Sequence, residues 1–226
     1  MADNFPGLSW AYNSREFSDL TIVFEFYTFK LHKVIIFGQS PILRALCDGK
    51  EEVKLESFTD IEYPQAYEAM FHFMYGLEYD DSSFDNLIIF YFEMYRVARY
   101  YEYRRLQLFA FEKFKEYTTK SWNAGEFMDV LIKGVNLNDE DLQDVLKKAC
   151  HEHFDELYID SNFQDIIQER KGLAFELVKC FSQSLKKYRC PRCKKLWSLD
   201  STILPSPSYC PNCGLFRAFW DHLYGF

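Results

Sequence analysis

The chain has 226 residues, of which 48% are hydrophobic and 19% aromatic, so it can bury a substantial core in one large domain or two small ones. Its net charge of −8 argues against a general binder of polyanions. The sequence contains no phosphate-binding glycine loop, no nucleophile elbow and no HExxH pattern, which excludes those enzyme classes. We therefore expect a protein that is not an enzyme, has no catalytic residues and takes no small-molecule substrate.

Composition also indicates where the protein is expected to act. No stretch approaches the ~20 apolar residues of a membrane span, and the first residues lack the charged segment and apolar run of a secretory signal. The sequence therefore predicts a soluble, intracellular protein without a membrane partner, with the nucleus slightly favoured over the cytoplasm. In that environment paired cysteines are expected to bind a metal ion and not to form disulfides.

The first predicted elements are two strands within DLTIVFEFYTFKLHK, residues 19–33. Two short runs rich in Thr, Ile, Val and Phe with nearly alternating polarity favour a hairpin. The turn near residues 25–28 lacks the Gly, Asn or Asp that tight turns prefer and carries Phe26 and Tyr27 instead. Because these two rings have no evident local packing role, we predict that they belong to a surface for a protein partner.

Two short helices are expected after the hairpin, within KVIIFGQSPILRAL, residues 33–46. Ser40 followed by Pro41 marks the start of the second helix, because proline is well tolerated in a first turn. The next segment, EVKLESF at residues 52–58, predicts a third strand.

Helical signals then dominate the sequence. A helix is expected to begin at Pro64 and to be stopped by Gly76. Residues 84–117 predict one or two further helices, because apolar residues recur there at spacings of three and four. These apolar positions are Ile88, Tyr91, Tyr95, Ala98 and Tyr101.

After Thr118 the strand signal disappears, and the sequence predicts consecutive short helices up to residue 187. Asn138 is a candidate N-cap, followed by acidic residues that favour the positive end of the helix dipole. An apolar stripe in this region is expected to pack in the core. It consists of Leu142, Val145, Leu146, Ala149 and Leu157.

Histidines and cysteines in this first part of the chain are expected to be structural. Cys150, His151 and His153 cannot converge on one metal ion, because positions one and three apart on a helix point in different directions. His32 and His72 lie in apolar contexts and are expected to be core or turn residues.

Several stretches of the first half resemble the BTB/POZ domain. They are FSDLTIV at residues 17–23, FKLHKVIIFGQSPIL at 29–43, EVKLESF at 52–58, AMFHFMYGLEY at 69–79 and MYRVARYYEYRRLQLFAFEKF at 94–114, in the order in which the family carries them. The resemblance implies an α+β BTB/POZ fold for residues 1–118. The helices of residues 119–187 are similar to the BACK-like, all-α extension that follows many BTB domains, particularly in fungal proteins. Residues 188–226 are then expected to form a small zinc-ribbon-like module.

The resemblance implies a protein–protein interaction adaptor or scaffold. BTB domains often form homodimers, and some recruit transcriptional corepressors or deliver substrates to cullin ubiquitin ligases. Asp19 and Lys33 lie where BTB repressors keep a charged pair at the dimer groove. The segment before Asp19 is short for the exchanged strand of many BTB dimers, and LCDGKEEVKL, residues 46–55, lacks the hydrophobic-x-Glu element of cullin adaptors. Homodimerisation and cullin binding stay open as alternatives.

The strongest motif is the spacing C-x2-C-x16-C-x2-C formed by Cys190, Cys193, Cys210 and Cys213. Short gaps let both sulfurs of a pair face the same ion, which predicts one tetrahedral Zn²⁺ with Zn–S distances of about 2.3 Å. Four protein ligands leave no position for water, so the zinc is expected to be structural. The 41 residues from Lys186 onward contain few aliphatic side chains, and so small a unit usually needs such a staple to fold.

The segment around these cysteines is basic. From Lys186 onward there are seven basic and two acidic residues, a net charge of +5, so residues 1–185 carry −13. Arg189, Arg192, Lys194 and Lys195 are candidate contacts for an anionic partner. The cations could equally keep the module soluble, or the module could only stabilise the helices that precede it. A transcription or chromatin regulator that binds nucleic acid is the alternative, but base-reading elements are not identifiable.

Overall fold

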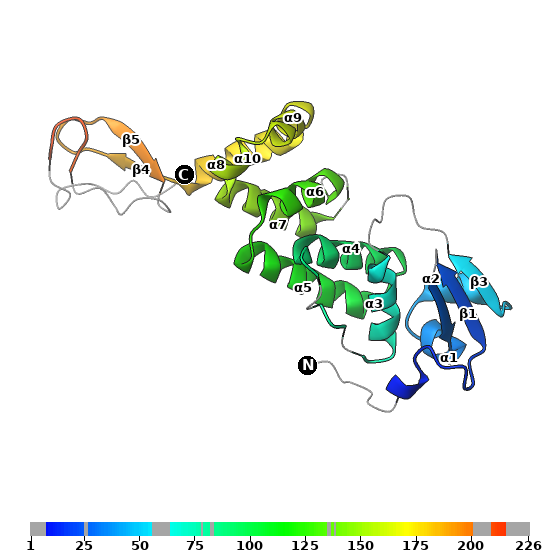
Figure 1. The fold of residues 1–226 in the computed structure, drawn as a ribbon. Helices are drawn as coiled ribbons and strands as arrows, with labels where there is room; N and C mark the ends of the chain where they lie inside the picture. The colour runs from blue at the N-terminus through cyan, green and yellow to red at the C-terminus, as the bar shows by residue number, and fades with distance from the viewer. Residues whose placement is uncertain are drawn as a thin grey trace. The chain divides into compact units, whose positions relative to one another are not determined.

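The computed structural model describes residues 8–24, 27–55, 64–77, 79–81, 84–134, 137, 139–200 and 209–215. The chain divides into two compact units, Met1–Lys133 and Gly134–Phe226 (Figure 1). The combination of a small sheet, a helical body, further helices and a cysteine cluster confirms the predicted α+β class. Among the described residues, no helix is both long enough and apolar enough to cross a bilayer.

The first unit contains a three-stranded sheet in the order β2-β1-β3. The predicted hairpin is confirmed: β1 (Leu20–Phe24) pairs antiparallel with β2 (Tyr27–Leu31). Its alternation places one face of the strand in the core. The buried residues of β1 are Leu20, Ile22 and Phe24.

The predicted third strand is present as β3 (Glu52–Leu55), and residues 56–58 of the prediction lie outside the described residues. This strand pairs in parallel with β1. The parallel direction requires a crossover, which the two helices between the strands supply.

Those helices are α1 (Lys33–Phe37) and α2 (Pro41–Cys47). Ser40 is the N-cap of α2, because its Oγ accepts a hydrogen bond from the backbone N of Leu43 at 3.0 Å. The same hydroxyl donates to the carbonyl oxygen of Tyr101 at 2.6 Å. The helix start predicted from Ser40 and Pro41 is confirmed, and the buried hydroxyl also links the helix to a distant part of the unit.

The next helix is α3 (Gln65–Met74), with Pro64 as its N-cap. Gly76 follows it with φ of 73°, a left-handed conformation that glycine adopts without steric cost. The predicted limits of this helix are therefore confirmed.

Two longer helices complete the centre of this unit, α4 (Leu87–Tyr100) and α5 (Arg104–Lys120) (Figure 1). Residues 88–98 of α4 are all buried, so α4 is the central helix. The apolar positions predicted to form its core face are buried as expected: Ile88, Tyr91, Tyr95, Ala98 and Tyr101.

Much of the aromatic content packs ring against ring in this core. Phe24 of the sheet stacks on Tyr67 of α3 with ring centroids 3.9 Å apart, and Phe29 lies 4.9 Å from Phe71. Such pairs add about 0.5–1.5 kcal/mol each beyond the burial of apolar area. The sheet is therefore attached to α3 through aromatic contacts that link distant parts of the sequence.

His32 is buried and connects three parts of the first unit. Its Nε2 lies 2.8 Å from the carbonyl oxygen of Glu16, and its Nδ1 lies 2.8 Å from the hydroxyl of Tyr75. Because a carbonyl only accepts, Nε2 carries the proton and Nδ1 accepts from the tyrosine. The backbone N of His32 donates to the same hydroxyl at 2.9 Å. The expectation of a core histidine is confirmed here, whereas His72 is half-buried.

Replacing Tyr75 by Phe is expected to lower the free energy of unfolding by about 2 kcal/mol, because it leaves the buried N–H and Nδ1 of His32 without their partner. Chemical denaturation measures the loss. Tyr100→Phe is the control in the same unit, since this residue is 51% exposed and should change stability by less than about 0.5 kcal/mol. Equal effects of the two substitutions would contradict this account of His32.

A further helix, α6 (Ala124–Gly134), is attached to α4. Glu126 accepts a hydrogen bond from the backbone N of Ile88 at 3.2 Å, at the start of α4, where backbone N–H groups lack intrahelical partners. Lys133 lies 3.1 Å from Glu93 in the middle of α4. By these contacts α6 belongs to the first unit, although it follows residue 118; the predicted domain limits at residues 118 and 187 stay predictions.

Glu93 is the centre of a buried ionic cluster. Its side chain has no exposed surface, and its Oε2 lies 2.9 Å from Arg96, whose side chain is 8% exposed. Burial raises the pKa of the Glu93 carboxyl, although Arg96 and Lys133 act to lower it. The unfavourable desolvation of the ionised carboxylate therefore outweighs the stabilisation that it receives from Arg96 and Lys133.

The second unit begins with the predicted succession of short helices: α7 (Glu140–Glu152), α8 (Phe154–Leu157), α9 (Ser161–Glu169) and α10 (Lys171–Ser184). Helix α10 packs against α7 and α9. This arrangement supplies a helical body of its own to the second unit.

The N-cap of α7 is Asp139, one residue later than predicted; Asn138 lies outside the described residues. Asp139 has extended backbone angles, and its carboxylate accepts a hydrogen bond from the backbone N of Leu142 at 3.0 Å, as a cap requires. The apolar stripe packs in the core as predicted, with Val145 half-buried and the others buried: Leu142, Leu146, Ala149 and Leu157.

Candidate metal centre and interaction surfaces

The cysteine module contains a two-stranded hairpin, β4 (Leu185–Arg189) and β5 (Leu196–Asp200). The strands are antiparallel, and Arg189 pairs with Leu196 at the end that leads into the connection. The first cysteine pair therefore lies in the short loop between two paired strands, which limits the positions that its sulfurs can take.

Both cysteine pairs have the same backbone hydrogen bonds. Around the first, the N of Cys190 donates to the O of Lys195 at 3.1 Å, and the N of Lys194 donates to the O of Cys190 at 2.9 Å. Around the second, the N of Cys210 donates to the O of Leu215 at 2.8 Å, and the N of Gly214 donates to the O of Cys210 at 2.9 Å. The two loops thus fold alike and each presents two thiols.

The four sulfurs lie within 4.8 Å of one another. Cys190 Sγ is 3.5 Å from Cys213 Sγ, and Cys193 Sγ is 3.8 Å from Cys210 Sγ. These separations exclude disulfides, whose S–S distance is about 2.05 Å. They fit a tetrahedron of thiolates around one ion at about 2.3 Å, for which neighbouring sulfurs lie about 3.8 Å apart. The cluster could therefore hold a metal ion.

The thiols of this cluster differ in acidity. The backbone N–H of Lys195 lowers the pKa of Cys193 to about 6. The N–H of Leu215 likewise acts to lower the pKa of Cys213, but desolvation and the three neighbouring sulfurs outweigh it and raise the pKa to about 12. Four sulfurs this close cannot all ionise without a cation among them, which is the chemistry that a metal ion supplies.

The first loop holds a strained residue where the second holds glycine. Lys194 has φ of 59° and Gly214 has φ of 70°, both in the left-handed region, which costs a residue with a side chain about 1–2 kcal/mol. Lys194→Gly is expected to stabilise the metal-bound module by about 1 kcal/mol, because strain is relieved.

Competition with a chelator at fixed zinc concentration measures this gain. Lys195→Gly removes the same charge at a position without positive φ, and it should weaken metal retention slightly. A loss of retention in Lys194→Gly as large as in Lys195→Gly would contradict the strain argument.

Four basic residues lie in or next to the first cysteine loop. Arg189, Arg192, Lys194 and Lys195 are all exposed. Two large apolar or aromatic side chains of the same module are also exposed, Leu196 at 65% and Tyr209 at 59%. The residues predicted to meet an anionic partner are therefore accessible, but no described contact assigns them a role.

Within the described residues, the four cysteines are the one group of three or more potential ligands close enough to share an ion. Cys150 is completely buried, and burial raises the pKa of its thiol to about 12, so it resembles a small core residue.

The predicted pair Asp19 and Lys33 is in contact, but through the backbone: Asp19 Oδ1 accepts a hydrogen bond from the N of Lys33 at 2.8 Å. Asp19 is exposed and Lys33 is half-buried. The carboxylate therefore lies at the start of α1, where it satisfies an N–H group that the helix leaves open. Its place at a dimer groove stays a prediction.

Exposed apolar residues flank this hydrogen bond, and the sequence reasoning missed them. Phe17 is 84% exposed, and Val34 is 83% exposed although it lies in a short apolar helix. The carbonyl oxygen of Glu16 lies 2.8 Å from His32 Nε2; Phe17 follows Glu16 directly, and Val34 comes two residues after His32. Val34 could have been identified, because it lies on the face of α1 away from the buried Ile36.

The hydrophobic turn predicted to bind a partner is only partly described. Phe26 lies outside the described residues. Tyr27 is half-buried as the first residue of β2, and its ring stacks on Phe29 with centroids 6.1 Å apart. Tyr27 thus has a local packing role, and a partner contact at this turn stays a prediction.

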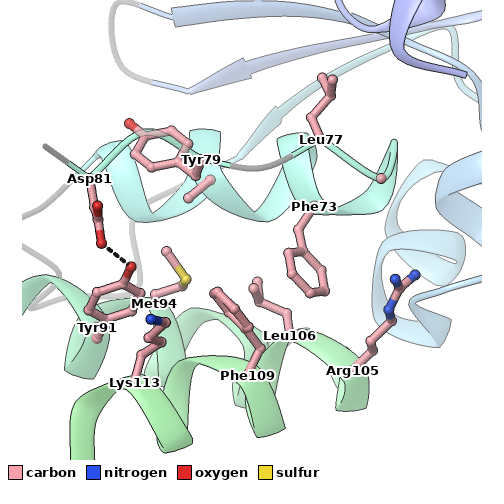
Figure 2. A pocket seen from close by; sticks show the side chains of 12 residues that line it. Phe73, Leu77, Tyr79, Asp81, Tyr91, Met94, Arg105, Leu106, Phe109 and Lys113 are labelled. Atoms are coloured by element: carbon pink, nitrogen blue, oxygen red, sulfur yellow. Dashed lines mark hydrogen bonds between the residues drawn. The ribbon is translucent and has the colours of Figure 1, made fainter. Parts of the chain in front are cut away.

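A pocket that sequence reasoning did not find lies between α3, α4 and α5, with a volume of about 330 Å³ (Figure 2). Most of its lining is apolar or aromatic, including Phe73, Met94, Leu106 and Phe109. No sequence signal identifies it, because its walls come from three helices and from the segment that follows α3, and these meet only in the folded unit.

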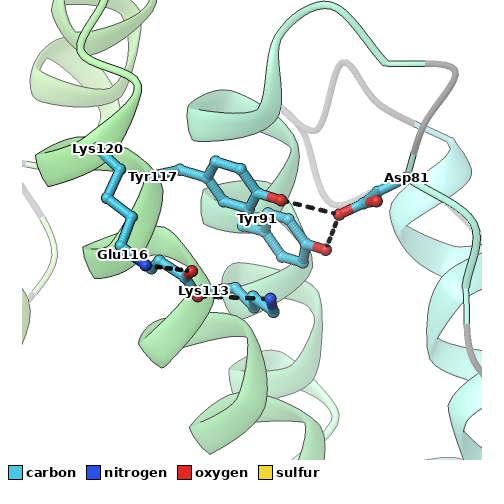
Figure 3. A network of polar contacts seen from close by, with 6 residues as sticks. All are labelled: Asp81, Tyr91, Lys113, Glu116, Tyr117 and Lys120. Atoms are coloured by element: carbon cyan, nitrogen blue, oxygen red, sulfur yellow. Dashed lines mark hydrogen bonds and ion pairs between the residues drawn. The ribbon is translucent and has the colours of Figure 1, made fainter.

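A polar network lies at one end of this pocket (Figure 3). Asp81 Oδ2 accepts hydrogen bonds from the hydroxyls of Tyr91, at 2.5 Å, and Tyr117, at 3.3 Å. Burial and the Asp81 carboxylate raise the pKa of Tyr91 well above its ordinary value. Burial raises the pKa of Tyr117 as well, so both phenols stay protonated and keep the carboxylate engaged.

The comparisons with known proteins agree with the architecture. The BTB/POZ domain family model matches residues 10–117, which include the sheet and helices α1 to α4 and most of α5. No curated protein matches the chain. The matched segment, the sheet order and the helices around α4 together establish that this chain carries a BTB/POZ domain at residues 10–117.

Proposed function

We propose that the protein is a non-enzymatic adaptor or scaffold that brings proteins together through its BTB/POZ domain and carries a structural zinc site in the segment of residues 188–226. The match to the BTB/POZ domain carries the proposal, because this domain is a protein-interaction and dimerisation module and generally has no catalytic role. Function is then a property of surfaces, so the exposed apolar residues of the domain are the places to test.

The first such surface consists of Phe17, Val34 and the Asp19–Lys33 contact, whose two residues are close to them in the sequence, and we name it the Val34 surface. Two large apolar side chains that are more than four-fifths exposed cost free energy in water and favour association. Asp19 and Lys33 offer polar groups at the same place. A second copy of the chain is the partner proposed for this surface.

Light scattering on the purified full chain tests the proposal. The wild type is expected to form dimers, and the double variant Phe17→Ser, Val34→Glu to be at least tenfold weaker in self-association, because it buries a charge in the contact. Leu108→Ser combined with Ile132→Glu is the matched control, since these residues are 49% and 47% exposed elsewhere in the unit. A double variant that associates like the wild type would overturn the Val34 surface. Serine replacement of Phe26 and Tyr27 tests the other predicted patch with the same readout.

Zinc is the ion that the cysteine cluster favours. Four thiolates in a tetrahedral arrangement suit Zn²⁺, and they leave no position for a catalytic water. The buried core of the described part of this module consists of Cys190 and Cys210, with only Cys193, Cys213 and Leu215 packed against them. Such a module depends on its metal ion for stability, which supports a structural site.

A nucleic-acid-associated regulator is the second candidate function. It is favoured by the four exposed cations Arg189, Arg192, Lys194 and Lys195, together with the exposed ring of Tyr209, on which a base can stack. Titration with a single-stranded oligonucleotide at rising salt separates the two functions. Binding that is micromolar or weaker and disappears near physiological salt favours the adaptor. A substrate receptor of a cullin ligase is a third alternative, which predicts that a cullin co-purifies with the protein.

A further inference from the structure

We propose that the pocket between α3, α4 and α5 receives one apolar side chain of an amphipathic helix of a partner protein, and that carboxylates one helical turn to either side of this anchor pair with Arg105 and Lys113. The inference depends on the proposed adaptor function and names the chemistry of a partner for it. It concerns a surface other than the Val34 surface.

The pocket wall that α5 provides has a regular pattern. Arg105, Phe109 and Lys113 follow at intervals of four residues, so they lie along one face of the helix over about 12 Å. All three line the pocket (Figure 2). An aromatic ring thus lies between two cations, each about one helical turn away.

The apolar part of the pocket suits a single side chain. The Phe109 ring is 38% exposed and lies 5.1 Å from the Phe73 ring of α3, so both rings are in place before a ligand enters. Met94 and Leu106, which are buried, complete this apolar part. A volume of about 330 Å³ is at the lower end of the range for ligand sites, which fits one large side chain better than a whole cofactor.

The charges of the lining select an acidic partner. Arg105 and Lys113 face one carboxylate, Asp81, in a chain whose net charge is −8. Asp81 is already engaged by two tyrosine hydroxyls, and Arg105 is exposed with its guanidinium 5.2 Å from the centre of the Phe73 ring. A carboxylate approaching the pocket would therefore meet two cations, whereas a basic side chain would meet them with like charge.

Lys113 can turn to a partner without leaving its present neighbour unpaired. It lies 3.4 Å from Glu116, which is also 2.9 Å from Lys120 (Figure 3). Both contacts are partly exposed to solvent, so each is weak and easily exchanged. When Lys113 pairs with a partner, Lys120 still neutralises Glu116.

These observations indicate recognition of a helix by its side chains at four-residue intervals. The complementary pattern is Glu-x3-Phe-x3-Glu, in which the phenylalanine enters the pocket and the two carboxylates reach Arg105 and Lys113. Leucine in place of phenylalanine would serve the same role, whereas a small or polar residue would leave the pocket unfilled.

The probe is a capped peptide of about 14 residues with this pattern on an alanine and glutamine background that favours helix. It is titrated into the full-length protein and followed by NMR chemical-shift changes. Binding is expected to shift residues of α3, α4 and α5 that line the pocket. The double variant Arg105→Gln, Lys113→Gln should weaken binding at least tenfold. Arg104→Gln with Lys115→Gln removes two cations from the same helix outside the pocket and should change it less than twofold.

Charge reversal provides the second test. Arg105→Glu with Lys113→Glu should abolish binding of the Glu-Phe-Glu peptide and allow a Lys-Phe-Lys peptide to bind. Equal binding by the two glutamine double variants, or by a Gln-Phe-Gln peptide, would overturn the proposal. Absence of peptide binding by a protein that still dimerises would refute the pocket proposal alone, whereas a monomeric protein that binds the peptide would support the pocket and refute only the Val34 surface.

Discussion

Replacing Cys190 by Ser should release the metal ion and unfold the cysteine module while the BTB/POZ domain stays folded. The described core of the module consists largely of the metal-binding cysteines themselves, so few other contacts hold its two loops together. Structural zinc sites contribute about 10–16 kcal/mol of apparent binding free energy in small zinc-finger peptides, and this energy is also folding energy, so weakening the site destabilises the module. We therefore expect about one zinc per chain in the wild type and far less in the variant.

Elemental analysis measures the zinc content, and hydrogen exchange measures protection of β4 and β5. Cys47→Ala is the matched control, because it removes a completely buried thiol of the first unit and should leave zinc content unchanged. Mild acid should also release the ion, since protons compete for the thiolates as pH falls. Folded wild-type protein without stoichiometric zinc, or a Cys190→Ser variant that keeps both zinc and protected strands, would contradict the site.

Replacing Lys133 by Met should destabilise the first unit by about 3 kcal/mol, because it removes one charged partner from Glu93, whose side chain has no contact with water. Burial already raises the pKa of this carboxyl, and loss of Lys133 raises it further. A carboxyl group whose pKa is higher in the folded than in the unfolded state stabilises the folded protein at pH values below the unfolded-state pKa. This stabilisation is lost as the pH rises through the folded-state pKa. The deficit of the variant should therefore be large near neutral pH and shrink toward about pH 4.

Chemical denaturation at several pH values measures this deficit. Lys120→Met is the matched control: it also breaks a lysine–glutamate pair, but the two side chains are 71% and 40% exposed, so the loss should be below about 1 kcal/mol. A second variant replaces Glu93, Arg96 and Lys133 together by apolar residues of similar size and should recover most of the stability. Equal effects of Lys133→Met and Lys120→Met would contradict the importance of the buried cluster.

Predictions from local sequence succeeded where neighbouring residues decide the structure. The alternation of β1 and β2, the helix start at Ser40 and Pro41 and the stop at Gly76 each depend on a few consecutive residues. The N-cap of α7 was misplaced by one residue, because Asn138 and Asp139 are both good caps and the backbone conformation chooses between them.

The surfaces were harder to predict. Phe26 and Tyr27 are predicted to bind a partner because they are aromatic residues in a turn, yet the ring of Tyr27 packs on Phe29 within its own strand. Phe17 and Val34 are the strongly exposed apolar residues near Asp19, but exposure depends on what the rest of the unit covers. The pocket was missed for the same reason: α5 shows the spacing of Arg105, Phe109 and Lys113, while the opposite wall is supplied by α3.

The sequence by itself determined the order of strands and helices, the BTB/POZ resemblance and the C-x2-C-x16-C-x2-C spacing of the cysteines, because these are written in short-range patterns. Only the tertiary structure decided the parallel pairing of β3, the attachment of α6 through Glu93 and Lys133, and the pocket beside α5. Each of these features joins residues far apart along the chain, and such contacts depend on how whole elements pack and not on the preferences of any one segment.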